Sequence, residues 1–252
     1  MKMDKKVRNL VFTSVLAALV IVLQVVITVS VSSFPITFAL IPIVIGAVVL
    51  GPVSGTVLGV VFGVVVSILS LTGKDPGGQM VFAANPFMAW FLCILKGAMA
   101  GFIPAILYRL FKKHEYAVNV TYAFTGIFLF LGGLGVSQLM DGKSTAVKII
   151  LAVVFSLIAG GLLFAMSKLL TSENAACYIA SVAAPICNTG IFIIGMLIFF
   201  RPLLNTWAGG SDTLVYVLTG LCGVNFLLEL TTSILATPVV VAVSKYSAKR
   251  HI

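Results

Sequence analysis

A long apolar run in the last quarter of the chain, Leu214 to Val243, carries Asn225 and Glu229 near its centre. On a helix, two side chains four residues apart share one face. The hydrocarbon core of a bilayer takes up about 20 helical residues, so a helix over this run places both side chains near the midplane. A carboxylate there costs at least ~2.5 kcal/mol unless it is protonated, paired or hydrated. Other segments must therefore offset that cost.

The composition places most of the 252-residue chain in lipid. Apolar residues make up 60% of the chain, charged residues make up 9%, and the mean hydropathy is +1.19. A soluble domain carries about 25% charged residues. The charged MKMDKKVRN segment precedes the first apolar run, with no small-residue cleavage site after it, so we expect a retained helix and not a signal peptide.

Eight apolar segments predict an all-α integral membrane protein, a bundle of about eight transmembrane helices. Their expected ranges are 10–31, 36–50, 51–71, 86–111, 117–138, 146–170, 175–200 and 214–243. Residues 1–252 are expected to form a single transmembrane domain, with Pro185 breaking the seventh helix. The polar connections 72–85 and 201–212 are predicted to be loops on the outer side, the first of them a lid or binding loop.

The positions of the basic residues predict the orientation of the helices. The net charge is +9, and eleven of the sixteen basic residues lie at the chain ends or at every second connection. This is the positive-inside pattern, which places both termini in the cytoplasm and argues against nucleic-acid binding. These residues are Lys2, Lys5, Lys6, Arg8, Arg109, Lys112, Lys113, Lys168, Lys245, Lys249 and Arg250.

Glycine recurs every four residues in the third segment, at Gly51, Gly55, Gly59 and Gly63. Each glycine costs up to ~1 kcal/mol of helix propensity relative to alanine. In return, the repeat leaves a bare groove along which a neighbouring helix backbone can lie closely. We therefore expect this segment to be packed against protein on that side.

The sequence contains few residues that could catalyse a reaction or bind a metal ion. Both histidines, His114 and His251, lie at predicted cytoplasmic ends, and the aspartates lie in loops or tails. The four cysteines, Cys93, Cys177, Cys187 and Cys222, lie in apolar runs, as buried cysteines do. The segment SQLMDGKS, 137–144, lacks the first glycine of a P-loop. We expect no enzyme activity, no metal and no cofactor.

The apolar segments contain a small set of polar side chains: Gln24, Lys96, Asn188, Asn225 and Glu229, with Asn85 at the outer rim. Two interpretations are open. In the first, Lys96 and Glu229 form a buried ion pair that joins two helices, although such pairs add little net stability. In the second, the set lines a polar cavity that binds a small molecule. The two interpretations are compatible while no ligand is bound.

Four blocks of the sequence carry a resemblance to a known family. They are FPITFALIPIVIGAVVLGPVSGTVLGVVFG (34–63), LKGAMAGFIPAILYRLFKK (95–113), APICNTGIFIIGMLIFF (184–200) and GVNFLLELTTSILATPVV (223–240). In this order they resemble helices of the substrate-specificity subunits, the S components, of energy-coupling factor (ECF) importers. That family has six core helices. The resemblance thus implies four core helices in 10–114, an inserted helix pair in 115–171 and two core helices in 172–252.

The resemblance implies a multi-pass protein of the bacterial plasma membrane that binds a water-soluble vitamin or a related small polar solute with high affinity. Its partners would be a transmembrane coupling subunit and two cytoplasmic ATPase subunits. In the family, small residues on the first helix face the coupling subunit. Here that role would fall to Ser14 and Ala18. A carboxylate-bearing vitamin such as pantothenate or a folate would suit Lys96.

Each polar residue then has an expected role. Glu229 and Lys96 would meet charged groups of the ligand, Asn188 and Asn225 would exchange hydrogen bonds with it, and Gln24 and Asn85 would line the mouth. The rival interpretation is a stand-alone secondary transporter in which Glu229 takes up a proton. A third is a scaffold in which these residues are purely structural.

Overall fold

A computed structural model describes residues 4–26, 29–30, 35–126, 170–210, 212–217 and 223–249. The chain divides into two compact units, one of residues 1–109 and 180–252 and the other of residues 110–179. The first unit contains every predicted site residue. The second contains the predicted insert, 115–171, of which residues 127–169 lie outside the described residues. The two helices predicted there, 117–138 and 146–170, stay largely a prediction.

The described chain is almost entirely helical. Its helices are α1 (Lys5–Val26), α2 (Leu40–Val49), α3 (Pro52–Leu71), α4 (Pro76–Ala84), α5 (Pro86–Phe111), α8 (Ser172–Phe199), α9 (Arg201–Ala208), α10 (Thr213–Tyr216) and α11 (Gly223–Lys249). Two-residue strands, β1 (Val29–Ser30) and β2 (Pro35–Ile36), pair in antiparallel register between α1 and α2. Five of the described helices are long and apolar enough to cross a membrane. These features indicate a multi-pass membrane protein.

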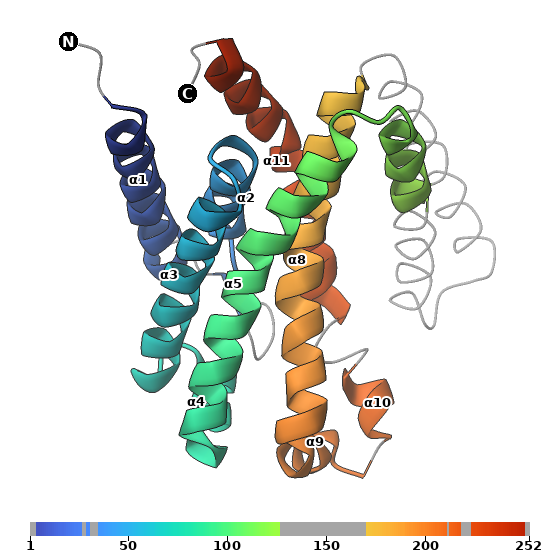
Figure 1. Ribbon diagram of the computed structural model, residues 1–252. Helices are drawn as coiled ribbons and strands as arrows, with labels where there is room; N and C mark the ends of the chain where they lie inside the picture. Colours follow the sequence, from blue (N-terminus) through green and yellow to red (C-terminus); the bar gives the residue numbers. More distant parts are fainter. Residues whose placement is uncertain are drawn as a thin grey trace. The chain divides into compact units, whose positions relative to one another are not determined.

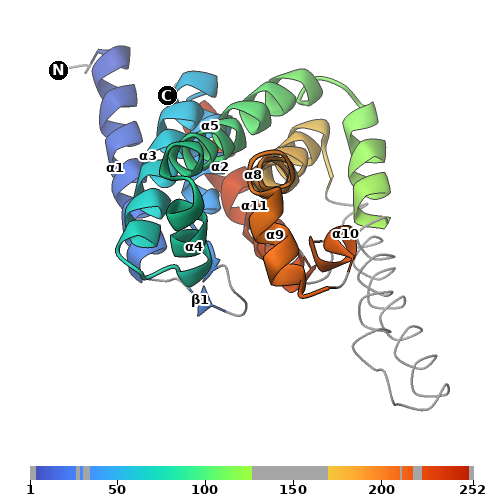
Figure 2. The same cartoon turned by 90° about the horizontal axis from the view of Figure 1, so that it is seen from below.

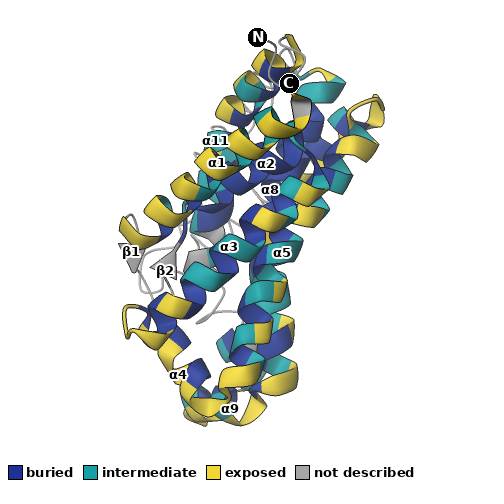
Figure 3. Ribbon diagram, turned by 60° about the vertical axis from the view of Figure 1, so that its left-hand side comes forward, coloured by how far each residue is buried: buried dark blue, intermediate teal, exposed yellow. Residues whose placement is uncertain are grey.

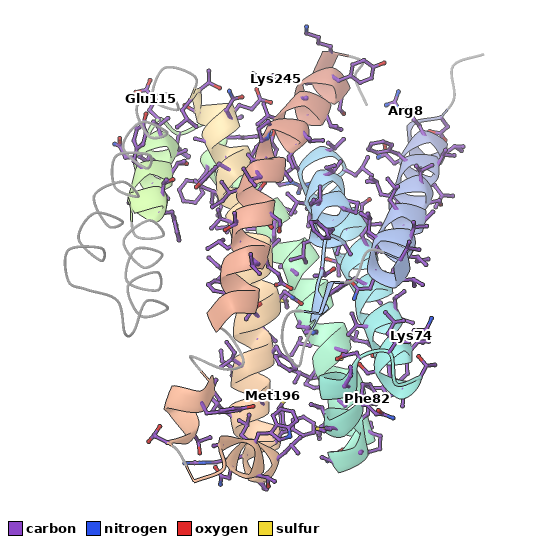
Figure 4. All side chains as sticks on the ribbon, turned by 180° about the vertical axis from the view of Figure 1, so that it is seen from behind. Arg8, Lys74, Phe82, Glu115, Met196 and Lys245 are labelled. Carbon is purple, nitrogen blue, oxygen red and sulfur yellow. The ribbon has the colours of Figure 1, made fainter. Side chains whose placement is uncertain are left out.

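The helices of the first unit run between two ends. α1 begins and α11 ends at the same end, while α4 and α9 lie at the opposite one (Figure 1). Figure 4 places Arg8 and Lys245 at the first end, and Lys74, Phe82 and Met196 at the second. Figure 2 looks along the bundle from the α4 and α9 side. We name these two ends the Arg8 end and the α4–α9 end.

The short helix α2 lies inside the first unit and is almost wholly buried (Figure 3). It contacts α1, α3 and α11. Its ten residues span about 15 Å, half of the ~30 Å hydrocarbon core. The chain before it is extended or turned because Pro35 and Pro42 disfavour an earlier helical start. The N-terminus of α2 is therefore buried in protein, where Thr37 is 5% exposed and Ala39 is fully buried.

Glycines join α3 to α5 with their backbones in close contact. A Cβ atom added at Gly55, Gly59 or Gly63 would collide with the backbone carbonyl oxygens of Gly101, Gly97 and Cys93, respectively. The two helices thus cross antiparallel in one continuous close contact, which confirms the packing predicted for these three positions. Gly51 serves a different purpose. Its φ is +98°, and the Arg109 guanidinium fills the space that a side chain would need.

Two predicted loops are helical, so these predictions were wrong. Residues 76–84 form α4, which begins at Pro76 after the N-cap Asp75. The Asp75 carboxylate accepts hydrogen bonds from the Gly78 N–H at 3.0 Å and the Ser70 hydroxyl at 2.9 Å. Residues 201–208 form α9, which ends at Gly209 with φ +58°. A capping side chain or an early proline starts each helix, and a left-handed glycine ends α9.

Replacing Asp75 with alanine is expected to loosen α4 while leaving the long helices folded. The substitution removes the cap and leaves the Ser70 hydroxyl without its α4 partner, at a local cost of about 1–2 kcal/mol. Hydrogen exchange followed by mass spectrometry should show faster exchange across residues 76–84. The matched control is Gln79→Ala on the exposed side of the same helix. Equal protection in Asp75→Ala and Gln79→Ala would contradict the assigned role.

One prediction about a long helix also differs from the structure. Pro185 lies inside α8, which is continuous from Ser172 to Phe199, because a helix loses only a local hydrogen bond at proline and the rest of the ladder persists. The prediction of one helix over the apolar run 214–243 stays a prediction. α10 ends at Tyr216, α11 begins at Gly223, and residues 218–222 lie outside the described residues. Glu229 is therefore near the start of α11.

The second unit is described at 110–126 and 170–179. Residues 116–126 are helical, and two threonines join them to the start of α8. The Thr121 hydroxyl donates to the Ala175 carbonyl oxygen at 3.4 Å, and the hydroxyls of Thr125 and Tyr178 lie 2.9 Å apart. Buried hydroxyl contacts of this kind fix one helix against another.

Candidate functional site

Glu229 is the centre of a buried polar cluster. Its side chain is 6% exposed, and one carboxylate oxygen, Oε2, accepts a hydrogen bond from the Thr189 hydroxyl of α8 at 3.3 Å. The Asn188 side chain and the backbone N–H of Thr37 also interact with this carboxylate. Groups from α8, α11 and the segment before α2 therefore meet at one carboxylate. Together they offset the cost of placing it among apolar helices.

Thr37 links this carboxylate to α1. Its hydroxyl donates to the Gln24 side-chain oxygen and accepts from the Ala39 N–H at 3.0 Å. Gln24 is 3% exposed, so the link is buried. Thr37 also places the N-terminus of α2 beside Glu229, and the partial positive charge of a helix N-terminus favours a carboxylate.

Lys96 supplies the positive charge of the cluster. Its side chain is half-buried on α5, and its ammonium nitrogen lies 4.8 Å from the centroid of the Phe192 ring on α8. The charge of Lys96 acts on Glu229, but the contacts of the described residues include no direct ion pair between the two. The structure thus shows a lysine held over an aromatic face near a carboxylate. It does not show the predicted helix-joining ion pair.

Asn188 has an acceptor that the described residues leave unused. Its side chain is 5% exposed and interacts with Glu229 through the amide. Only the NH₂ of an amide donates, so the carbonyl oxygen Oδ1 faces elsewhere. This oxygen is buried and has no hydrogen-bond partner among the described residues. An orphaned buried acceptor costs about 1–3 kcal/mol, so a native structure keeps one for a reason.

The remaining predicted residues lie apart from these contacts. The Asn85 side chain is exposed and caps α5, where its oxygen accepts from the Met88 N–H at 3.1 Å. Asn225 lies in α11, but its side chain falls outside the described residues. Ser14 and Ala18 are exposed on α1. The structure therefore brings together Gln24, Lys96, Asn188 and Glu229 and does not bring Asn85 to them.

Three residues of the cluster were missed in the sequence: Thr37, Thr189 and Phe192. Threonine and phenylalanine are ordinary in apolar helices, so neither stands out by composition. Helical spacing offered a signal for two of them. Thr189 is adjacent to Asn188, and Phe192 follows Asn188 by four residues and so lies on the same face of α8.

A separate pocket of about 230 Å³ lies at the α4–α9 end. Pro76, Gly77, Met80, Trp207 and Tyr216 line it, so α4, α9 and α10 contribute to its wall. Trp207 of α9 is the largest side chain among these lining residues. Within the described residues no three His, Cys, Asp or Glu side chains gather in a way that could hold a metal ion.

Thr37→Val should destabilise the bundle by about 1–2 kcal/mol, because it keeps the shape of the side chain and removes the hydroxyl that joins Gln24 to the Ala39 N–H. Thr37→Ser keeps the hydroxyl and is the matched control, with an expected change of less than about 0.5 kcal/mol. The measurement is unfolding in mixed micelles, followed by tryptophan fluorescence. Equal stability of the valine and serine variants would show that the hydroxyl does not hold this link.

The cluster combines a carboxylate, an amide with a free acceptor, a hydroxyl, a helix N-terminus and a cation over a ring. All of these groups lie among apolar helices. Comparison with known proteins adds no assignment to this geometry. No family model matches the sequence, and no curated protein matches it.

Proposed function

We propose that the protein is a membrane-embedded binding subunit that captures a small polar solute, and that it works as the S component of an ECF-type importer. The observation that carries the proposal is the convergence of Lys96, Asn188 and Glu229, which come from three apolar helices. Polar side chains among apolar helices are costly, so their convergence favours a site over chance placement. The unused Asn188 oxygen adds a group that a solute can satisfy.

The proposed orientation places the Arg8 end in the cytoplasm of a bacterial cell and the α4–α9 end outside. Arg8, Arg109 and Lys245 lie on helices that begin or end at the Arg8 end, as the positive-inside rule requires of the cytoplasmic face. The pocket beside Trp207 would then be at the outer mouth. A solute would enter between α4 and α9 and descend to Glu229.

The assignment of ECF partners rests on the sequence resemblance and on one face of α1. This helix is exposed along much of its length (Figure 3). Its exposed large apolar side chains include Leu10 and Val15, and Ser14 and Ala18 are also exposed. Small residues four apart let a second helix approach closely. A transmembrane coupling subunit, which in turn carries two ATPase subunits, is the proposed occupant of this face.

The decisive experiment is uptake into liposomes that contain the purified chain with or without an ECF coupling subunit and its two ATPases. Native mass spectrometry of the purified chain first identifies a co-purifying solute, which is then used as the labelled probe. We expect ATP-dependent accumulation only with all partners present, and binding without accumulation by the chain alone. Absence of both binding and partner-dependent uptake would refute the proposal.

A stand-alone proton-coupled carrier is the second candidate, favoured by the buried carboxylate of Glu229 on a membrane-spanning helix. Such carboxylates carry protons in many transporters. The same liposomes distinguish the two functions. Accumulation by the chain alone, driven by a pH gradient and abolished in Glu229→Gln, would favour the carrier over the importer subunit.

A further inference from the structure

The cluster offers two kinds of recognition at different heights along α8. At the first height, the Glu229 carboxylate and the unpartnered Asn188 oxygen are both acceptors. At the second, the Lys96 ammonium lies over Phe192, four residues further along the helix. Residues at this spacing have Cβ atoms about 5–6 Å apart. Asn188, which contributes an acceptor, and Phe192, which lies under the cation, are therefore roughly one helical turn apart on α8.

The order of the two levels follows from the direction of α8. Phe192 precedes Met196 by four residues, and Met196 lies at the α4–α9 end (Figure 4). The Lys96 level is therefore nearer to that end, and the Glu229 level is deeper. A solute that arrives past the Trp207 pocket would meet the cation first and the acceptors afterwards.

From this juxtaposition we infer that the site takes a zwitterion of the α-amino acid type. The ligand ammonium donates to the Glu229 carboxylate and to the Asn188 oxygen, and the ligand carboxylate meets the Lys96 ammonium. This inference rests on the proposed function, because it assumes that the cluster is a solute site. It names the class of solute.

Charge balance is the physical reason for a zwitterion. The ionised forms of Glu229 and Lys96 have opposite charges, and both residues lie in apolar helices. A ligand with only a carboxylate satisfies Lys96 but adds negative charge near Glu229, and a ligand with only an amine does the reverse near Lys96. A zwitterion adds no net charge and supplies each group with its opposite.

The length and flexibility of the Lys96 side chain suit it to bind the ligand carboxylate. An ammonium on a four-carbon stem rotates readily, so it can leave the ring of Phe192 and turn to a carboxylate. The acceptor pair is fixed more firmly, because Thr189 and the Thr37 N–H hold the Glu229 carboxylate from two elements. The ligand ammonium therefore meets a preformed partner, and its carboxylate meets an adjustable one.

The test uses the full chain in lipid nanodiscs and the twenty L-amino acids as probes, each at 1 mM or below. For the tightest binder, affinities are compared with those of its decarboxylated amine and its des-amino acid. Pantothenate and folate are included as carboxylates without an ammonium group. We expect at least one amino acid to bind and both of its analogues to bind at least about 30-fold more weakly, as loss of one buried charged partner predicts.

Variants locate the two interactions. Glu229→Gln and Asn188→Leu should weaken binding of the amino acid and barely change binding of its des-amino analogue. Lys96→Met should leave binding of the decarboxylated amine unchanged. Lys245→Met, at an exposed position near the end of α11, is the matched control. The comparison of analogues on the unmutated protein stays decisive if a variant fails to fold.

Equal binding of an amino acid and either analogue would overturn the inference, and so would a panel in which no amino acid binds. Binding of pantothenate or folate in place of amino acids would overturn it while supporting the proposed function. If no solute binds and the liposome assay is also negative, the inference and the proposed function are both refuted.

Discussion

The double variant Lys96→Met/Glu229→Gln is expected to be more stable than the sum of its two single variants predicts, although it no longer binds solute. Each single substitution leaves one charge in apolar surroundings without its opposite. Removing a partner from a buried pair costs about 3–5 kcal/mol, and because these two residues are not in direct contact we expect roughly 1–3 kcal/mol for each. The double variant removes both charges, so the coupling should be about 1 kcal/mol or more.

This double-mutant cycle distinguishes a structural role of Lys96 and Glu229 from a role in solute binding. Stability is measured by denaturant titration of the protein in mixed micelles, and binding is measured with the co-purifying solute. A purely structural pair predicts that the double variant recovers both properties, whereas a solute site predicts recovery of stability alone. Lys245→Met, which removes an exposed cation from α11, should change neither. Strictly additive stabilities would show that Lys96 and Glu229 do not act on each other.

The sequence could predict the polar members of the site because charged and amide side chains are rare in apolar helices. Lys96, Asn188 and Glu229 stand out for that reason, and the structure brings them together. The structure does not bring Asn85 to them, since a residue between two helices can equally serve as a cap. Thr37 could not be selected, because its contact with Glu229 is made by a backbone N–H, whose position depends on where α2 begins.

The starts of α4 and α9 carry helix signals that are visible in the sequence. Asp75 followed by Pro76 is a start signal for a helix, yet the surrounding glycines and polar residues favoured a loop. α9 has no capping side chain, and its start signal is the early proline Pro202. Short helices near the membrane surface have too few residues for a clear apolar period, so capping is their main signature. Burial against α3 then decides the fold of α4.

The glycine repeat of α3 forms a helix contact together with a second set of glycines on α5. The sequence shows Gly55, Gly59 and Gly63 on one segment, and Gly97 and Gly101 at matching spacing on another. Each set alone indicates close packing, and only the antiparallel crossing shows that they face each other. Pairing between segments depends on three-dimensional register, which periodicity in one segment does not contain.

Gly59→Val should separate α3 from α5 and destabilise the bundle by about 3 kcal/mol or more. A Cβ atom at position 59 would collide with the carbonyl oxygen of Gly97 and lie 3.1 Å from the Ala98 nitrogen. Both obstacles are backbone atoms, so no side chain can turn away to make room. The gain in helix propensity on leaving glycine is at most about 1 kcal/mol and cannot offset the separation of two helices. Denaturant titration in mixed micelles measures the loss.

Gly190→Val on α8 is the matched control, because a Cβ atom there meets no atom of the described residues within 4 Å. It should change stability by less than about 1 kcal/mol. The reciprocal variant Gly97→Ala should also destabilise, and the pair Gly59→Ala/Gly97→Ala should cost less than the sum of its parts, because the first substitution already moves the helices apart. Since Gly97 adjoins Lys96, the same separation should shift the ammonium and weaken solute binding. Equal stabilities of Gly59→Val and Gly190→Val would contradict the close crossing of α3 and α5 on which the position of Lys96 depends.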